Sequence, residues 1–398
     1  MSRRVLLLTQ RFAPDTVVAA VRASAWARGL AARGWDVHCI TRNYGGESAL
    51  ETNVTVHRVG NYAGSHSRTN SDDAGRSLAI GRWIWPDPSG VFWLRNVGAI
   101  KKLSKSIAPD IVLSSSPPHS IHLLGHHLAA TNKVPWVADF RDPYLEDVRY
   151  GGANAFLYPA HWVTERWMYK RADRIIHAIP THDRQMRLRA PNLSHRMHLI
   201  TNAALFDPYK FRQIRRTGHE RELVAFSGGT VDPDIIEALV RGAESIRMRL
   251  RIEVAGWRYS APNSSPGVSV EYLGPLPHHL YHPKMACADV LVGGNSPDRQ
   301  KVGGLSSKLF DYLSTGRPII FVRPTKADVE YFGHIERVLF TGECSTGVMA
   351  TWLSEAAHGS KGSDLEAGQF FFDNHNLEKK VSLLDDVLEE AIASYAEQ

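Results

Sequence analysis

The chain has 398 residues, a length suited to two domains of about 150–200 residues each. Hydrophobic residues make up 43% and charged residues 22%, which excludes a disordered or fibrous chain. A net charge of +6 favours anionic partners. No block of consecutive Lys and Arg with interleaved aromatic residues occurs, so nucleic acid is not an expected partner.

The sequence predicts neither a membrane span nor an export signal. No apolar run approaches the roughly 20 residues that a span needs. The apolar run at residues 5–8 ends before Gln10 and Arg11, and it indicates a first strand rather than a signal peptide. Three widely spaced cysteines form no disulfide framework or metal-ligand cluster, which fits a reducing compartment. We therefore expect a cytoplasmic protein.

Short β-branched runs alternate with helical patterns through the first half of the chain. Between the first two runs, Ala23, Trp26, Ala27 and Leu30 recur at helical spacing, and Gly34 ends that helix. This alternation predicts a parallel sheet covered by helices on both faces. The expected strands lie at residues 5–8, 37–40, 54–59, 111–114, 136–138, 175–178 and 198–200.

A second series of strands follows a connecting stretch near residues 203–221. Its members lie at residues 223–226, 251–255, 268–272, 290–293, 319–322 and 338–340. We therefore expect an α/β protein with two doubly wound domains, one over residues 1–205 and one over residues 222–375. Residues 376–398 carry Val381, Leu384, Leu388 and Ile392 near helical spacing, which predicts an amphipathic helix that packs back across the domain junction.

Several common motifs are absent. The chain has no G-x-G-x-x-G after a strand, no G-x-x-x-x-G-K-[ST] and no G-x-S-x-G. This argues against a nicotinamide dehydrogenase, a P-loop enzyme and an α/β-hydrolase. Asp232 and Asp234 have the spacing of a metal-binding pair, but they precede an expected helix, whose N-terminus favours carboxylates without a metal. We expect no metal site.

The most informative segment is KVGGLSSKLFDYLSTGRPII at residues 301–320. A loop of small residues opens a helix, and Gly316 closes it. Exposed N–H groups at such a helix start, together with the helix dipole, suit a diphosphate. Lys308 adds positive charge, and Asp311, about one turn further on, can accept from two ribose hydroxyls. The physics alone leaves two interpretations open, a nucleotide site and a plain turn before a helix.

This segment resembles the motif of the family 4 glycosyltransferases, which have the GT-B architecture of two Rossmann-like domains facing a cleft. The resemblance aligns Gly303 with the first acidic position of the motif and Asp311 with the second, which holds the ribose. Gly303 has no carboxylate, so the role of the first acid does not transfer. The resemblance implies six donor contacts, three to the sugar and then three to the diphosphate: Gly304, Leu305, Ser306, Ser307, Lys308 and Leu309.

The loop after residue 227 resembles the family's second donor segment, and it implies donor contacts from Gly228, Gly229 and Thr230. Many members have an Arg where this chain has Gly229, and a downstream Lys that has no equivalent here. Lys308 is therefore the expected catalytic cation. We expect the amides of Gly228, Gly229 and Ser307 to help it stabilise charge on the diphosphate.

The segments SSSPPH and PWVADFRDP resemble a branch of the family that acts in bacterial surface-glycan and secondary-metabolite pathways. The resemblance implies a second catalytic residue, His119, in the cleft. Asp139, Arg141 and Asp142 follow the next strand, at the edge where open α/β sheets form ligand clefts. Acceptor binding and an internal Arg–carboxylate brace both stay open for them. For Arg22, on the first helix, contact with an anionic acceptor and simple solvation both stay open, and solvation is slightly favoured.

The resemblance implies a retaining, metal-independent glycosyltransferase that moves a sugar from a nucleotide diphosphate to a hydroxyl or amine acceptor. No cofactor is expected beyond this donor substrate. The acceptor is expected to be a small molecule, a glycan or a lipid-linked molecule, and peripheral contact with the inner membrane face is left open. Two alternatives also stay open: a nucleotide-sugar epimerase and a non-catalytic partner protein that binds a nucleotide.

Overall fold

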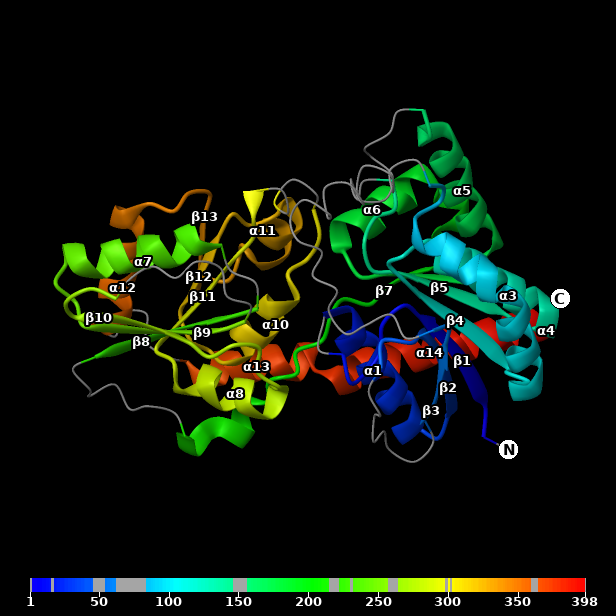
Figure 1. Cartoon of the computed structure of the whole chain (residues 1–398), viewed down its shortest axis with the longest axis horizontal. Coiled ribbons are helices and arrows are strands. Elements are labelled where there is room, and N and C mark those ends of the chain that lie inside the picture. The colour runs from blue at the N-terminus through cyan, green and yellow to red at the C-terminus, as the bar shows by residue number, and fades with distance from the viewer. Residues whose placement is uncertain are drawn as a thin grey trace. The chain divides into compact units, whose positions relative to one another are not determined.

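The computed structural model describes residues 2–15, 18–45, 54–61, 84–145, 156–214, 222–229, 232–256, 264–297, 300, 303–358 and 364–397. The chain divides into two compact units (Figure 1). Unit 1 consists of Met1–Asn202 with Leu377–Gln398, and unit 2 is Ala203–Asn376. The chain therefore leaves unit 1 close to the expected end of the first domain and returns to it for the last helix.

Unit 1 is built on a seven-stranded sheet in the order β3-β2-β1-β4-β5-β6-β7. Neighbouring strands are all parallel, and their apolar side chains are buried because helices cover both faces. The strands are β1 (Arg4–Thr9), β2 (Asp36–Arg42), β3 (Val54–Val59), β4 (Ile111–Ser116), β5 (Trp136–Phe140), β6 (Arg174–His177) and β7 (Met197–Leu199).

Two hydrophobic clusters, one for each face of the sheet, hold unit 1 together. The last helix of the chain completes the first cluster, because Val381, Leu384 and Leu388 are buried there beside Trp26 and Leu30 of α1. The expected amphipathic helix is thus present, and it packs on the N-terminal unit. The helices are α1 (Val18–Ala32), α3 (Ser89–Ile107), α4 (Ser120–Asn132), α5 (Tyr158–Arg171), α6 (Pro180–Arg189) and α14 (Leu377–Ala396).

Unit 2 has a six-stranded parallel sheet in the order β10-β9-β8-β11-β12-β13. Its strands are β8 (Leu223–Gly228), β9 (Leu250–Ala255), β10 (Val268–Tyr272), β11 (Val290–Gly294), β12 (Ile319–Val322) and β13 (Val338–Thr341). Its helices are α7 (Pro233–Ser245), α8 (His278–Cys287), α10 (Ser307–Ser314), α11 (Lys326–Phe332), α12 (Thr346–Ala357) and α13 (Leu365–His375).

The two doubly wound α/β sheets confirm the predicted fold class. Each expected strand overlaps a strand of the structure, because short apolar runs between helical patterns mark strands that are buried on both faces. Among the described helices, none is both long enough and apolar enough to cross a membrane.

Candidate functional site

The end of β8 meets the start of α10 in unit 2. Lys308, in the first turn of α10, donates from Nζ to the carbonyl oxygen of Gly228 at 3.2 Å. Gly229 follows with φ +79°, and a Cβ added there would lie 3.7 Å from Lys308 Nζ. The fold thus brings Lys308 to the glycine loop that the sequence analysis assigned to the same phosphate site.

The loop before α10 owes its shape to two glycines with left-handed backbone. Gly303 has φ +79° and Gly304 has φ +112°, values that glycine adopts freely and other residues rarely do. A side chain at Gly303 would meet no atom within 4 Å, so the obstacle to an acidic residue is the backbone conformation rather than space. An acidic residue at this position would therefore be strained in the backbone conformation that Gly303 adopts.

Asp328 holds this loop from the neighbouring helix α11. Its side chain is fully buried. Its Oδ1 accepts from the backbone N–H of Ser306 at 2.8 Å, and its Oδ2 accepts from the Ser306 hydroxyl at 3.1 Å and from the Thr325 N–H at 3.0 Å. The Thr325 hydroxyl donates to the Gly304 carbonyl oxygen at 2.6 Å. Burial raises the pKa of Asp328, while these hydrogen bonds oppose the rise.

The sequence analysis missed Asp328, although a signal was present. Thr325 and Asp328 have the Ser/Thr-x-x-acid spacing of a capping box, and in the structure they form one at the start of α11. That spacing identifies a helix N-terminus. It does not predict that Asp328 also contacts Ser306, because that contact joins α11 to the start of a different helix, α10.

Hydrogen bonds within unit 2 correct three of the expected donor contacts. The Ser306 N–H donates to Asp328, the Gly228 N–H donates to the hydroxyl oxygen of Tyr312 at 2.9 Å, and the Gly229 N–H donates to the Ala255 carbonyl at 2.8 Å. These N–H groups are directed into the protein, because the end of the strand and the loop use them for hydrogen bonds within unit 2.

The remaining donor residues fall into three groups. Ser307 and Lys308 form the first turn of α10 and stay together at the candidate site. The side chains of Leu305 and Leu309 are buried in unit 2, so any donor contact from these residues would come from their backbone, and their contacts stay predictions. Thr230 lies outside the described residues.

The side chain of Asp311 already has partners within the chain, and the ribose contact expected of it stays a prediction. Its Oδ1 accepts from the N–H groups of Leu205 at 2.6 Å and Phe206 at 3.0 Å. These two residues belong to the segment by which the chain enters unit 2. Burial raises the pKa of Asp311 to about 6, although both hydrogen bonds act to lower it. One carboxylate oxygen of Asp311 is therefore committed to the polypeptide.

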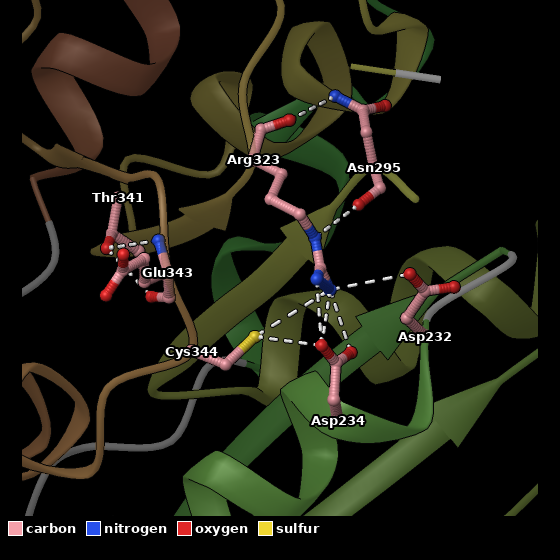
Figure 2. A network of polar contacts seen from close by, with 7 residues as sticks. All are labelled: Asp232, Asp234, Asn295, Arg323, Thr341, Glu343 and Cys344. Atoms are coloured by element: carbon pink, nitrogen blue, oxygen red, sulfur yellow. Dashed lines mark hydrogen bonds and ion pairs between the residues drawn. The ribbon is translucent and has the colours of Figure 1, made fainter. Parts of the chain in front are cut away.

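Arg323 organises the adjacent edge of the sheet, as Figure 2 shows. Its guanidinium donates to Asp234 at 2.8 Å and to the backbone oxygen of Asn295 at 3.0 Å, and it lies 3.4 Å from Asp232. The Asn295 side chain donates in turn to Oδ2 of Asp328 at 3.4 Å. Asp232, which precedes α7, and Asp234, in its first turn, are thus ion-paired to Arg323, and the network continues to the residue that holds the α10 loop.

In unit 1, the structure corrects the expected position of His119. Its side chain is 0% exposed, and its ring centroid lies 4.8 Å from that of Tyr144 and 6.0 Å from that of Phe140. A ring buried in this way presents no surface to a substrate. The geometry gives no support to the catalytic role that the resemblance implied.

Asp139 belongs to an internal brace. Arg22 Nη2 lies 3.1 Å from Asp139 Oδ1, and the Ser115 hydroxyl donates to Asp139 Oδ2 at 2.7 Å. Arg22 also donates to the Ile200 carbonyl at 2.8 Å and is buried, so the expectation that it is solvated is wrong. The brace that the sequence analysis left open is present, and its arginine is Arg22.

Arg141 and Asp142 follow directly after β5 and are half-buried. Both lie close enough to Arg22 to act on its pKa, which Arg141 lowers and Asp142 raises, although burial and Asp139 have the larger effects. They remain the acceptor candidates of unit 1, since Asp139 is committed to its own ion pair.

With this geometry established, comparison with known proteins shows which fold and which domain family the chain resembles. Two Rossmann-like units with parallel sheets make up the GT-B fold, as the sequence predicted. Residues 19–203, slightly under half of the chain, match the model of the glycosyl transferase 4-like domain. No curated protein matches the chain at the level of sequence.

Similar solved structures extend over almost the whole chain. Sucrose-phosphate synthase from Thermosynechococcus elongatus has a TM-score of 0.66 at 15% identity, covering 98% of this chain and 100% of that one. WaaG, a glycosyltransferase involved in lipopolysaccharide biosynthesis, has a TM-score of 0.60 at 15% identity, covering 96% and 99%. HepE from Anabaena, in complex with UDP and glucose, has a TM-score of 0.58 at 12% identity, covering 98% and 100%. At these identities the likeness establishes the fold.

Proposed function

We propose that the chain transfers a sugar from a nucleotide diphosphate to a hydroxyl or amine acceptor, with retention of the anomeric configuration. One observation carries the donor site: the Lys308 ammonium lies at the start of α10, beside the Gly228 carbonyl. A lysine and a helix N-terminus together attract a diphosphate. The GT-B neighbour HepE, which was solved with UDP, supports a nucleotide as the ligand of this site.

In the proposed reaction, the bond between the anomeric carbon and the diphosphate oxygen breaks. The acceptor oxygen or nitrogen bonds to the same face of the sugar, and its proton passes to the departing diphosphate oxygen. No pair of carboxylates is required for this step. Lys308 stabilises the negative charge that grows on the leaving group. Metal independence belongs to the proposal, because Lys308 and α10 supply positive charge where a metal would act.

The proposed acceptor is a glycan, a lipid-linked molecule or a natural product of a bacterial biosynthetic pathway. Two observations support this choice: the resemblance of the N-terminal segments, and the likeness to WaaG. Arg141 and Asp142 are the proposed acceptor-binding residues. Peripheral contact with a membrane is part of the proposal, since unit 1 exposes large apolar side chains near basic ones on α3 and α5.

Binding of UDP, GDP, dTDP and CMP, each with and without magnesium, tests the donor site by thermal shift or ligand-observed NMR. We expect one nucleotide to bind selectively without the metal. With its sugar derivative as donor, Lys308→Ala should lower catalytic efficiency at least about tenfold, because a charge-assisted phosphate contact is lost.

Lys284→Ala is the matched control, since Lys284 pairs with Glu253 at 3.2 Å in the same unit. It should keep the affinity and activity of the wild type. Equal kinetics for Lys308→Ala and the wild type would remove Lys308 from the site. Binding that requires magnesium would contradict metal independence.

The products distinguish the transferase from the two alternatives. Release of free nucleotide only when an acceptor is present supports transfer. A new epimer of the donor without an acceptor favours the epimerase, and nucleotide binding without either product favours a non-catalytic partner protein.

A further inference from the structure

Ser306 occupies the N-cap position of α10 but does not cap that helix with its side chain. A serine at an N-cap usually accepts a hydrogen bond from an N–H of the first turn. The Ser306 hydroxyl instead donates to Asp328 Oδ2 at 3.1 Å. Elsewhere in unit 2, Thr325 caps α11 and Asp364 caps α13 through their side chains, whereas Ser345 at α12 and Asp232 at α7 form no side-chain cap.

The environment of Asp328 accounts for this orientation of the Ser306 hydroxyl. Asp328 is fully buried and, as a carboxylate, can only accept hydrogen bonds. Donors surround it from three segments: Ser306 before α10, Thr325 at the start of α11, and Asn295 after β11. The Ser306 hydroxyl therefore has to donate its proton toward α11, which turns the side chain away from the first turn of α10.

We propose that Asp328 is a positioning residue for the donor diphosphate, because it keeps the Ser306 hydroxyl from capping the helix turn that receives the anion. The inference rests on the proposed function, which places the diphosphate at the first turn of α10 beside Lys308. A serine cap and a phosphate oxygen compete for the same backbone N–H groups. Asp328 thus acts on the donor through Ser306 and does not touch it.

Asp328→Asn tests this role with little change of volume. The asparagine amide keeps one acceptor oxygen, but its NH₂ group takes the place of the second oxygen and cannot accept a hydrogen bond. The Ser306 hydroxyl therefore loses its acceptor and is free to turn toward α10. Once released, it caps α10 and competes with the anion. We expect binding of the nucleoside diphosphate to weaken about fivefold, the equivalent of one ordinary N-cap.

The double variant Asp328→Asn with Ser306→Ala separates this mechanism from simple loosening of the loop. Without its hydroxyl, residue 306 cannot cap α10. Binding of the nucleoside diphosphate and of inorganic pyrophosphate, measured by calorimetry on the full chain, should return to within about twofold of the wild type. Asp364→Asn, which removes a carboxylate cap from α13, is the matched control and should leave both affinities unchanged.

Two results would overturn the proposal. In one, the double variant binds as weakly as Asp328→Asn, so Asp328 merely supports the loop. In the other, Asp328→Asn binds as tightly as the wild type. If Asp328→Asn does not fold, Asp328→Glu takes its place, because glutamate is a usual partner in a capping box and its longer side chain displaces the carboxylate from Ser306.

Amide hydrogen exchange tests the same role without a ligand. Exchange at residues 307–309 should be slower in Asp328→Asn than in the double variant, since only the single variant can form the serine cap. Equal rates would contradict the role of Asp328. If the wild type binds neither pyrophosphate nor any nucleoside diphosphate, the proposed function fails, and the exchange comparison still decides whether Asp328 controls Ser306.

Discussion

Asp311 illustrates how a single half-buried carboxylate can fix the path of the chain. Its Oδ1 accepts from two consecutive backbone N–H groups, those of Leu205 and Phe206, where the chain enters unit 2. Phe206 is itself buried, with its ring stacked on Phe211 at a centroid distance of 5.0 Å. The entering segment is therefore held at one point by hydrogen bonds to α10 and by an apolar side chain beside it.

The raised pKa of Asp311 predicts a pH-dependent stability. Burial moves this pKa from 3.8 to about 6. Between those values the folded chain binds a proton that the unfolded chain does not, so the contribution of Asp311 to stability is complete below the lower value and is lost as pH rises through the upper one. Relative to Asp311→Asn, the wild type should lose about 1–3 kcal/mol of unfolding free energy between roughly pH 4 and pH 7 in urea titrations.

Asp364 provides a control, because its contribution to stability should depend on pH in the opposite direction. A hydrogen bond from the Ala367 N–H lowers the pKa of Asp364. The stabilisation from that residue is therefore present above its ordinary pKa and is lost as pH falls. Parallel stability curves for the wild type and Asp311→Asn would show that Asp311 titrates at its ordinary pKa, contrary to the prediction.

At the level of whole elements, local sequence predicted the strands and helices but not the contacts between them. The runs that became β8 and β12 are short, apolar and bounded by turn residues, so each is visible within a few positions. The brace of Arg22 with Asp139 joins residues 117 positions apart, and the contact of Ser306 with Asp328 spans 22. Contacts between residues so far apart in the sequence leave no periodic pattern in it. The structure was therefore needed to find them.

Large apolar side chains are exposed on α3, on α5 and just before α5 in unit 1. The side chains of Leu94, Phe156 and Trp162 are 74%, 84% and 47% exposed. Trp85, just before α3, donates to the Thr164 hydroxyl of α5 at 3.0 Å, which links the two helices. Helix α3 has no acidic residue, and the one acid of α5 is buried. The basic side chains of the two helices are Arg95, Lys101, Lys102, Lys105, Arg166, Lys170 and Arg171.

We predict that the chain sediments with vesicles that contain phosphatidylglycerol and much less with vesicles of phosphatidylcholine alone, because apolar insertion and basic charge act together. Replacing Leu94, Phe156 and Trp162 with serine should lower the bound fraction at least about fivefold, since three large apolar side chains no longer insert. Phe370→Ser in unit 2 removes a side chain that is 73% exposed and serves as the control. Equal binding to both lipid compositions would contradict a charge-dependent surface.

The two units differ in whether they are built from one continuous segment of the chain or from two. Unit 2 is one continuous segment, and it contains Lys308, Asp328 and the complete six-stranded sheet. Unit 1 is discontinuous, because α14 supplies Val381, Leu384 and Leu388 to its core. A side chain at Gly29 of α1 would overlap Val381, so the two helices pack at very short range.

This difference predicts different behaviour for fragments of the molecule. Residues 203–376 should fold alone and bind the same nucleoside diphosphate as the full chain, since the candidate donor site lies within that segment. Residues 1–202 should not reach a cooperative native state alone, because loss of several buried side chains of α14 costs about 2–5 kcal/mol for each leucine. Joining residues 377–398 to residues 1–202 through a flexible linker should restore cooperative urea unfolding. Cooperative folding of residues 1–202 alone would show that α14 is dispensable to unit 1, and a folded 203–376 fragment that binds no nucleotide would show that the donor site requires unit 1.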